Sequence, residues 1–504
     1  MSKKVKQFLS ALVLIIPTFT FANGGIDEKI NSVFEPLVEV LATIFFFKPF
    51  GFLGFEMPMI VMWLIIGAVF FTIYLRFVNL RKAKHAIELI KGDFDDPDDK
   101  GEVSHFQALV TALSGTVGLG NIAGVAVAIA TGGAGATFWM VFAGFFGMSA
   151  KYVGCTLGVK YREINEEGEV SGGPMYYLSK GLEKQGKGVL GKILAVVFAI
   201  LCVGGSFGGG NMFQSNQSYA QLSNVFPVFE GYGFAYGIVI AILVGVVIIG
   251  GIKSIAKVTD KIVPVMVGVY VLACLIIIFV NFSNLGHAVS LILEGAFTGK
   301  GIQGGIIGVL VIGVQRAAFS NEAGVGSATI AHAAVKTDEP ITEGVVAMLG
   351  PFIDTIVICT MTALVLIFTG FAEDTTGLTG AELTSAAFSS LFPWFRYVLL
   401  VAIVLFAFST MISWSYYGLK AFTFLFKRFI GEKTSEIIYK VMFLFFVVVG
   451  SSSSLGAVMD FSDMMILGMA LPNVLGLYFL VREVKDDTVD YFKRVASGKI
   501  KKFK

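Results

Sequence analysis

The chain has 504 residues, of which 55% are hydrophobic and 15% are charged, and its formal net charge is +2. Soluble domains average about 25% charged residues, so this composition excludes a series of soluble domains and predicts an all-α polytopic membrane protein. The small net charge gives no indication of a nucleic-acid partner. The four cysteines lie within hydrophobic segments and form no CxxC motif, so no disulfide framework is expected: Cys155, Cys202, Cys274 and Cys359.

Residues 1–22 have the pattern of a signal peptide. Lysines near the start precede a short apolar run, and a Thr-Phe-Ala sequence ends at residue 22. The run is shorter than the ~20 residues that a membrane-spanning helix needs, which favours a cleaved signal over an uncleaved anchor helix. Residues 23–56 would then form an external N-terminal segment.

Eleven hydrophobic segments after residue 56 are predicted to be transmembrane helices. Several exceed the ~20-residue minimum, so tilted, kinked or broken helices are expected. The first of them, residues 57–77, is an extra helix outside a core of ten. The ten core helices are expected at 106–131, 135–159, 190–222, 233–252, 261–282, 303–334, 344–370, 394–426, 436–453 and 460–481.

Lysine and arginine cluster in alternate loops of this arrangement. The loops 223–232 and 371–393 contain no basic residue, whereas the C-terminal tail, 482–504, contains eight. Because basic loops stay in the cytoplasm, the mature N-terminus is predicted outside and the basic tail inside. The alternation also supports the number of spans, since a wrong number would have mixed basic and bare loops on one side.

The stretch SGTVGLGNIAG, Ser114 to Gly124, interrupts the first core helix. Glycine in a helix interior costs roughly 1 kcal/mol relative to alanine. Lipid cannot satisfy the backbone groups that a break frees, so a break is tolerated only where it is buried in protein or lines a wet cavity. The stretch is therefore interpreted as half of a substrate and ion site.

A second stretch of this kind, AAFSNEAGVGSATIAHA, lies in the sixth core helix at Ala317 to Ala333. Two groups of five helices have opposite orientations in the membrane, and paired broken helices mark the site of inverted-repeat transporters. We therefore expect a first inverted repeat at 106–282 and a second at 303–481. The alternative is a pair of unrelated glycine-rich packing seams, which are common in membrane proteins.

Several polar side chains lie inside the predicted spans. Glu322 lies in the second break, where a carboxylate costs roughly 2.5–3.5 kcal/mol and should face the protein interior. It is interpreted either as a cation ligand or as a strut that pairs with backbone amides or with Arg316. Gln214 belongs to an amide-rich stretch and either faces a polar cavity or bonds between helices. Asp354 and Asp460 are assigned no role.

The ninth span carries a hydroxyl cluster and a tryptophan. Ser409, Thr410 and Ser413, together with freed carbonyls, would form an oxygen site suited to an alkali cation, or the hydroxyls bond back within their own helix. Thr410 and Trp414 are four residues apart and share a helix face. Trp414 either closes an apolar pocket or is a packing residue.

Three motifs resemble the signatures of the alanine or glycine:cation symporter family, and they occur in the expected order. They are GLGNIAGVAVAIATGGAGATFWM (Gly118–Met140), SGGPMYYL (Ser171–Leu178) and FSNEAGVGSATIAHA (Phe319–Ala333). The resemblance covers essentially the whole chain from residue 57 onward. One departure is Ala134, in an external turn, where many members have proline; it should not affect the site.

The resemblance implies a five-plus-five inverted-repeat fold with broken first and sixth core helices, and it implies the roles of single residues. Amides of the first break would face the substrate carboxylate, and carbonyls and hydroxyls would hold a cation. The implied substrate-binding residues are Gly118, Gly120, Asn121, Gln214, Ser320, Asn321, Gly324, Thr410 and Trp414. The implied cation-binding residues are Ser114, Val117, Asn121, Ser409, Thr410 and Ser413, with Glu322 as a further candidate.

The predicted function is sodium-coupled import of small neutral amino acids, alanine and glycine, by alternating access in a bacterial or archaeal plasma membrane. Sodium is expected as the coupling ion, and no cofactor is expected. A proton-coupled or broader-specificity amino-acid transporter of the same fold is the alternative. A channel is a further possibility. An enzyme is disfavoured, because the sequence contains no nucleophile–base constellation, metal-ligand spacing or nucleotide-binding loop.

Overall fold

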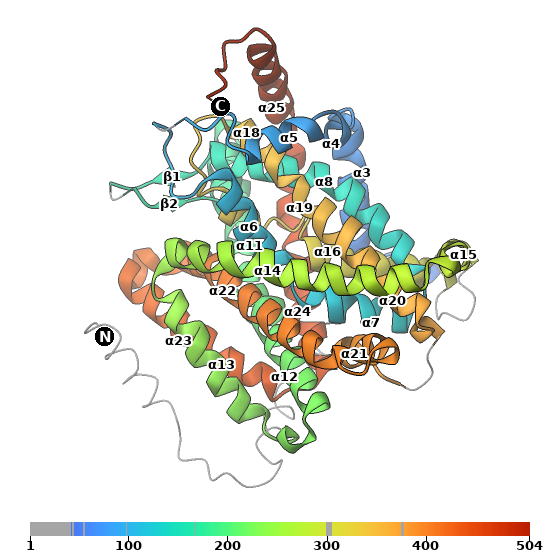
Figure 1. Ribbon diagram of the computed structural model, residues 1–504. Coiled ribbons are helices and arrows are strands. Elements are labelled where there is room, and N and C mark those ends of the chain that lie inside the picture. The colour runs from blue at the N-terminus through green and yellow to red at the C-terminus, as the bar shows by residue number, and fades with distance from the viewer. Residues whose placement is uncertain are drawn as a thin grey trace.

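The computed structural model describes residue 42 and residues 45–503, with gaps at 54–55, 97, 167, 299–304 and 374–376. The predicted signal peptide and most of the predicted external segment lie outside the described residues. Within them the chain is mostly helical, and the strands form one antiparallel pair, β1 (Glu163–Ile164) with β2 (Val170–Ser171) (Figure 1).

Seven helical segments of the described chain are long and apolar enough to cross a membrane, which confirms a multi-pass helical membrane protein. An eighth candidate consists of two helices, His105–Thr116 and Gly120–Gly132, bent by 52° at a break. Three shorter apolar helices coincide with further predicted spans: Met59–Tyr74, Gly233–Ile248 and Gly305–Asn321.

The first half of the fold contains α3 (Met59–Tyr74), α4 (Val78–Arg81), α5 (Ala83–Ile90), α6 (His105–Thr116), α7 (Val125–Gly132), α8 (Ala136–Lys160), α9 (Pro174–Tyr176), α10 (Leu182–Lys184), α11 (Gly188–Phe207), α12 (Phe213–Val225), α13 (Gly233–Ile248) and α14 (Gly251–Val280). The second half contains α15 (Leu285–Thr298), α16 (Gly305–Asn321), α17 (Thr329–His332), α18 (Pro340–Ala347), α19 (Leu349–Pro351), α20 (Thr360–Phe368), α21 (Gly380–Leu391), α22 (Phe395–Ile430), α23 (Glu432–Ser451), α24 (Leu455–Gly468) and α25 (Ala470–Ala496).

Short segments of tighter or wider helix join several of these elements. The 3-10 segments are η1 (Gly51–Leu53), η5 (Pro227–Phe229), η6 (Phe282–Asn284) and η8 (Phe371–Glu373). The π-helical segments are η2 (Gly120–Gly124), η3 (Tyr177–Gly181), η4 (Gly208–Met212) and η7 (Phe352–Cys359). Segments of π-helix occur often at functional sites.

The first core helix is broken as the sequence predicts. A capping box starts α6: the Ser104 hydroxyl accepts from the Gln107 amide (3.2 Å), and the Gln107 side chain accepts from the Ser104 amide (3.2 Å). The helix ends at Thr116 and the chain continues into η2 at Gly120, so the break lies at residues 117–119.

The second break follows α16. Three of the next residues have positive φ: Glu322 (57°), Gly324 (79°) and Gly326 (99°). Glycine adopts this left-handed region without steric penalty, whereas Glu322 is one of few non-glycine residues that do so here. The chain becomes helical again only at Thr329, so the second predicted interruption is also confirmed.

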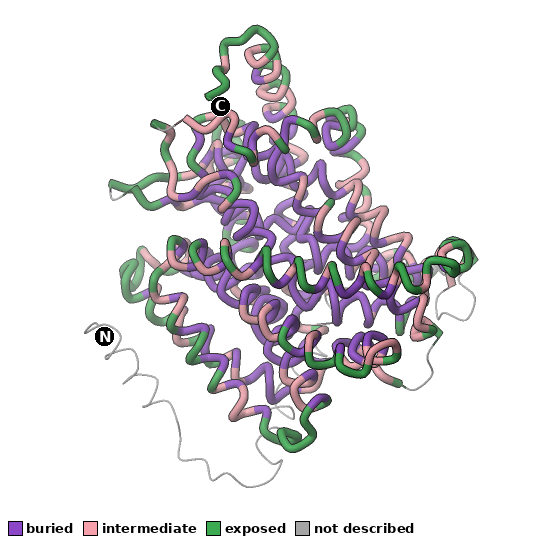
Figure 2. The backbone as a smooth tube through the Cα atoms, viewed as in Figure 1, coloured by how far each residue is buried: buried purple, intermediate pink, exposed green. Residues whose placement is uncertain are grey.

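The broken helices lie inside the bundle and the longer helices surround them (Figure 1). Buried residues fill this interior, and exposed residues concentrate on the outer helix faces and the ends (Figure 2). Helix α3, which the sequence analysis expects to lie outside the core of ten, packs against α8 and α25. Among the helices that the sequence analysis did not assign, the two longest are α15, against α8 and α16, and α21, against α12 and η2.

Candidate substrate and cation site

The two breaks contact each other at the centre of the bundle. A Cβ atom at Gly120 would lie 3.3 Å from the ring of Phe319 and 3.5 Å from the Cα atom of Ser320. A Cβ atom at Gly118 would lie 2.3 Å from the Thr410 hydroxyl oxygen. Glycine at both positions therefore lets the first break approach the second break on one side and α22 on the other.

Asn121 organises the backbone of the first break. Its side-chain oxygen accepts from the Gly118 amide (2.9 Å). Its Nδ2 donates to both the main-chain oxygen (3.1 Å) and the carboxylate of Asp354. The Leu119 amide donates to Gln214 Oε1 (3.2 Å), so Gln214 on α12 also contacts the break. Two freed amides of the first break thus face side-chain oxygens in the bundle interior.

Hydroxyls and an indole join α22 to the end of α6. Thr410 donates to the main-chain oxygen of Ser114 (3.0 Å), and the Ser114 hydroxyl donates to the main-chain oxygen of Ser409 (2.8 Å). The Trp414 indole donates to the main-chain oxygen of Gly115 (3.1 Å). The predicted residues of α6 and α22 therefore lie together in the structure.

The remaining hydroxyls of α22 differ in their partners. Ser409 bonds back to Phe406 in its own helix (3.0 Å), as the alternative interpretation expected. The Ser413 hydroxyl is buried and has no partner among the residues that the structure describes. A buried hydroxyl without a partner is a group that a ligand can satisfy.

The glycines before Gln214 make room for Trp414. A Cβ atom at Gly210 would lie 2.3 Å from the indole Cγ atom, and one at Gly205 would lie 3.5 Å from the ring. The tryptophan is 2% exposed. It therefore packs between α22 and the η4 segment rather than at the membrane surface.

The second break is held by η7. Ser320 donates to the Asp354 carboxylate (2.8 Å), and Thr355 donates to the same carboxylate oxygen (3.0 Å). Asn321 donates to the Thr355 hydroxyl (2.9 Å) and accepts from the Ala323 amide (2.8 Å). Asp354 therefore contacts both breaks, although the sequence analysis assigned it no role.

Glu322 and Arg316 do not pair with each other. Glu322 accepts from the Ser327 hydroxyl (2.5 Å), within its own break. Arg316 forms a buried ion pair with Asp463 on α24, which corrects the interpretation that Arg316 pairs with Glu322. The Arg316 guanidinium also lies 5.3 Å from the centre of the Phe319 ring.

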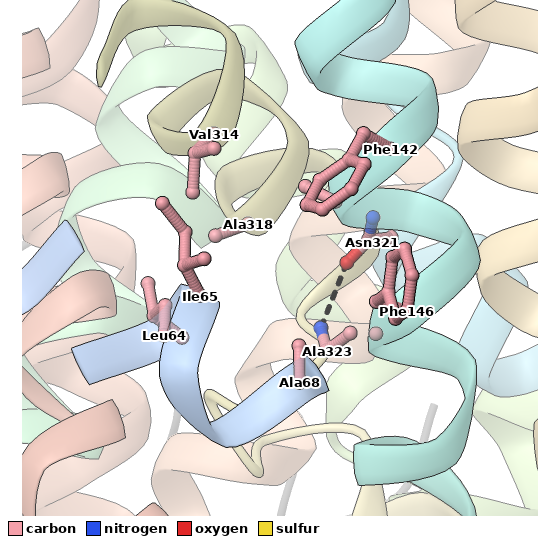
Figure 3. Close-up of a pocket in the computed structure, with 11 residues that line it drawn as sticks. Leu64, Ile65, Ala68, Phe142, Phe146, Val314, Ala318, Asn321 and Ala323 are labelled. Atoms are coloured by element: carbon pink, nitrogen blue, oxygen red, sulfur yellow. Dashed lines mark hydrogen bonds between the residues drawn. The ribbon is translucent and has the colours of Figure 1, made fainter. Parts of the chain in front are cut away.

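A crevice beside the second break has a different character. It lies between α3, α8 and α16 and is lined mainly by apolar side chains, with Asn321 and Ala323 at one end (Figure 3). There the Asn321 side-chain oxygen accepts from the backbone amide of Ala323. The apolar lining does not suit a zwitterion, so the polar centre between the breaks remains the candidate site.

Sequence reasoning assigned no role to two buried charged residues here: Asp354, which it named without a role, and Lys151, which it did not single out. Lys151 on α8 is 4% exposed and donates to the main-chain oxygen of Asn321 (3.1 Å). Each is an ionisable residue inside a predicted span, and that alone marks a functional candidate in a membrane protein.

The chain is similar to known transporters over most of its length. The family model described as the sodium:alanine symporter family matches residues 46–504. The sodium/alanine symporter AgcS of Methanococcus maripaludis is 42% identical over 437 residues, which are 86% of this chain and 93% of AgcS. The amino-acid carrier protein AlsT of Bacillus subtilis is 34% identical over 443 residues, which are 86% of this chain and 90% of AlsT.

A solved structure of MhsT in complex with L-phenylalanine has the same fold. Its TM-score is 0.53 at 15% identity, over 76% of this chain and 90% of MhsT. The chain therefore belongs to the sodium:alanine symporter family, and it is a membrane transporter for an amino acid and a cation rather than an enzyme.

Proposed function

We propose that the protein imports alanine and glycine by sodium symport with alternating access. The observation that carries the proposal is the meeting of two broken helices at one buried polar centre that contains Asp354. Helix ends and freed amides suit the substrate carboxylate, and oxygen ligands suit sodium and the ammonium group. A zwitterion needs both kinds of group in one place.

The proposed substrate position lies against the first break. There the Gly118 amide, which now donates to Asn121, would donate to the substrate carboxylate. That exchange would release the Asn121 oxygen to hold a cation. The other proposed substrate contacts are Gly120, Gln214, Ser320, Asn321, Gly324, Thr410 and Trp414. Trp414 would exclude large side chains, whereas a single methyl group is discriminated poorly, so overlapping use of alanine and glycine is expected.

The proposed cation ligands are oxygens of three elements. Main-chain oxygens of Ser114 and Val117 would act with the hydroxyls of Ser409, Thr410 and Ser413. We add Asp354 to this set because its carboxylate lies between Asn121 and Ser320, at the junction of both breaks. Glu322 remains a further candidate.

The proposed topology has eleven transmembrane helices, with the N-terminus outside and the C-terminus in the cytoplasm. Ten helices form two inverted repeats of five, and α3 is the additional helix. In this topology α16 enters the bundle from outside, so the Arg316–Asp463 pair lies on the outer side of the second break. We propose that this pair is part of the outer gate.

A proton-coupled transporter is the second candidate. The observation that favours it is a buried cluster in which Glu343 on α18 contacts the imidazoles of His105 (2.5 Å) and His332. His332 Nε2 has no partner in the described part of the chain. Imidazole and carboxylate groups of this kind carry protons in transporters.

The test is uptake of radiolabelled alanine into proteoliposomes with a sodium gradient, a proton gradient or neither. One sodium that crosses 100 mV and a tenfold gradient provides about 3.7 kcal/mol, enough for a few-hundredfold accumulation. Saturable, uphill uptake that needs sodium and that excess glycine inhibits is the expected result. Uptake driven equally by a proton gradient in the absence of sodium would favour the second candidate. Downhill, non-saturable flux would contradict both.

A further inference from the structure

One face of α8 packs against the second break through small residues. A Cβ atom at Gly147 would lie 2.6 Å from the Ala323 side chain, and one at Gly154 would lie 3.0 Å from the Thr329 side chain. Such seams normally consist of small residues throughout, because these let backbones approach closely. On this face of α8, residues at alternating intervals of three and four are glycines except for the middle one, which is a lysine. The five positions are Gly144, Gly147, Lys151, Gly154 and Gly158.

The surroundings of Lys151 accommodate its ammonium group. The group donates to the main-chain oxygen of Asn321, the last residue of α16 (3.1 Å). The carboxyl end of a helix carries a partial negative charge, which a cation stabilises. Gly350, after α18, also lies next to the ammonium group, because a Cβ atom at this position would lie 2.9 Å from the ammonium nitrogen. Glycine at position 350 thus leaves the space that the lysine fills.

Two buried carboxylates lie within reach of this charge. The main-chain oxygen that accepts from Lys151 belongs to Asn321, which precedes Glu322 and follows Ser320, and the Ser320 hydroxyl donates to Asp354 (2.8 Å). Glu322 and Asp354 are 2% and 0% exposed. Buried charges require compensation inside a membrane protein. The nearby Arg316 is paired with Asp463, so Lys151 is placed to compensate one of the two carboxylates, and one negative charge remains when both are ionised.

We propose that Lys151 is a resident cation of the transport site and replaces one coupling cation. The inference rests on the proposed function. Because the ammonium stays on α8, its charge is not released with the substrate. The wild-type protein therefore cotransports one cation fewer with each amino acid than a variant that lacks the lysine and keeps both carboxylates.

The test compares the limiting accumulation of alanine in proteoliposomes at zero membrane potential under an imposed sodium gradient. Each additional coupled sodium multiplies the limiting ratio by the sodium ratio, so a tenfold gradient gives Lys151→Gln a ratio about tenfold above the wild type. A parallel arm with only a proton gradient identifies a proton as the added cation. Lys151→Arg, which keeps the charge, should retain the wild-type ratio.

The double variant Lys151→Gln/Glu322→Gln restores the balance of charge and should return to the wild-type ratio. If Lys151→Gln loses transport, recovery in the double variant supports the inference, and loss in both overturns it. An active Lys151→Gln protein that keeps the wild-type ratio under both gradients also overturns it. A wild-type protein that shows no sodium coupling would instead contradict the proposed function.

Discussion

The ion pair between Arg316 and Asp463 permits a direct test of the proposed outer gate. The two side chains are 5% and 9% exposed and join α16 to α24. Phe319 lies between this pair and the first break, because its ring contacts Arg316 and approaches Gly120. A change at the pair therefore acts on the outer side of the candidate site without removing any proposed ligand.

Removing one partner of a buried pair costs about 3–5 kcal/mol, because the other charge is left uncompensated, whereas replacing both by apolar residues is often neutral. Here Arg316 Nη1 and Asp463 Oδ1 have no partner within the described ranges, so the pair is only partly satisfied. We therefore expect a loss near the lower limit, about 3 kcal/mol, for Arg316→Met or Asp463→Leu alone. The double variant should recover most of that stability.

The assays are thermal unfolding of the purified protein and alanine uptake in proteoliposomes. If the pair is a gate that must open and close, the double variant should be as stable as the wild type yet lose most uphill accumulation. Exchange of external for internal alanine should be less affected, because exchange needs no return of the empty carrier. A double variant that is stable and accumulates alanine like the wild type would show that the pair has a structural role only.

Three further variants test the site. Asp354→Asn, which keeps the shape of the side chain, should raise the sodium concentration for half-maximal uptake at least about tenfold; an unchanged sodium response would remove Asp354 from the cation site. Thr410→Ala should raise the sodium concentration for half-maximal uptake several-fold, since one hydrogen bond to Ser114 contributes about 1 kcal/mol. Thr410→Ser, which keeps the hydroxyl, should leave that concentration unchanged. Equal responses of the two variants would exclude the Thr410 hydroxyl as a cation ligand. Trp414→Ala should weaken alanine uptake or admit larger amino acids, and normal rate with normal selectivity in competition assays would contradict a pocket wall.

The positions of both breaks could be predicted because their cause is local. A cluster of glycines with an asparagine and hydroxyls inside an apolar segment is incompatible with an unbroken lipid-facing helix. The structure places the interruptions at residues 117–119 and after Asn321. The contact of Thr410 with Ser114 also followed the expected pairing of α22 with the first break.

The partners of the buried charges could not be predicted, because they depend on tertiary packing. Arg316 lies six residues before Glu322 but pairs with Asp463, 147 residues away. Lys151 was overlooked because its helix was identified by hydrophobicity, and one lysine hardly changes that average. The helices α15 and α21 were not assigned because both lie in the connections between the predicted spans and, at 14 and 12 residues, are shorter than the ~20 residues of a membrane-spanning helix.

The hydrogen bonds of the site also identify η7 as the element that joins the two breaks. Asn121 accepts from the Gly118 amide of its own break and donates to Asp354. Asn321 accepts from the Ala323 amide of its own break and donates to Thr355, the next residue of η7. In each break, the asparagine side chain accepts from a backbone amide of the same break and donates to one of two consecutive residues of η7, Asp354 or Thr355. Because η7 bonds to both asparagines, we expect the first and second breaks to rearrange together if, as proposed, substrate takes the place of Asn121 at the Gly118 amide.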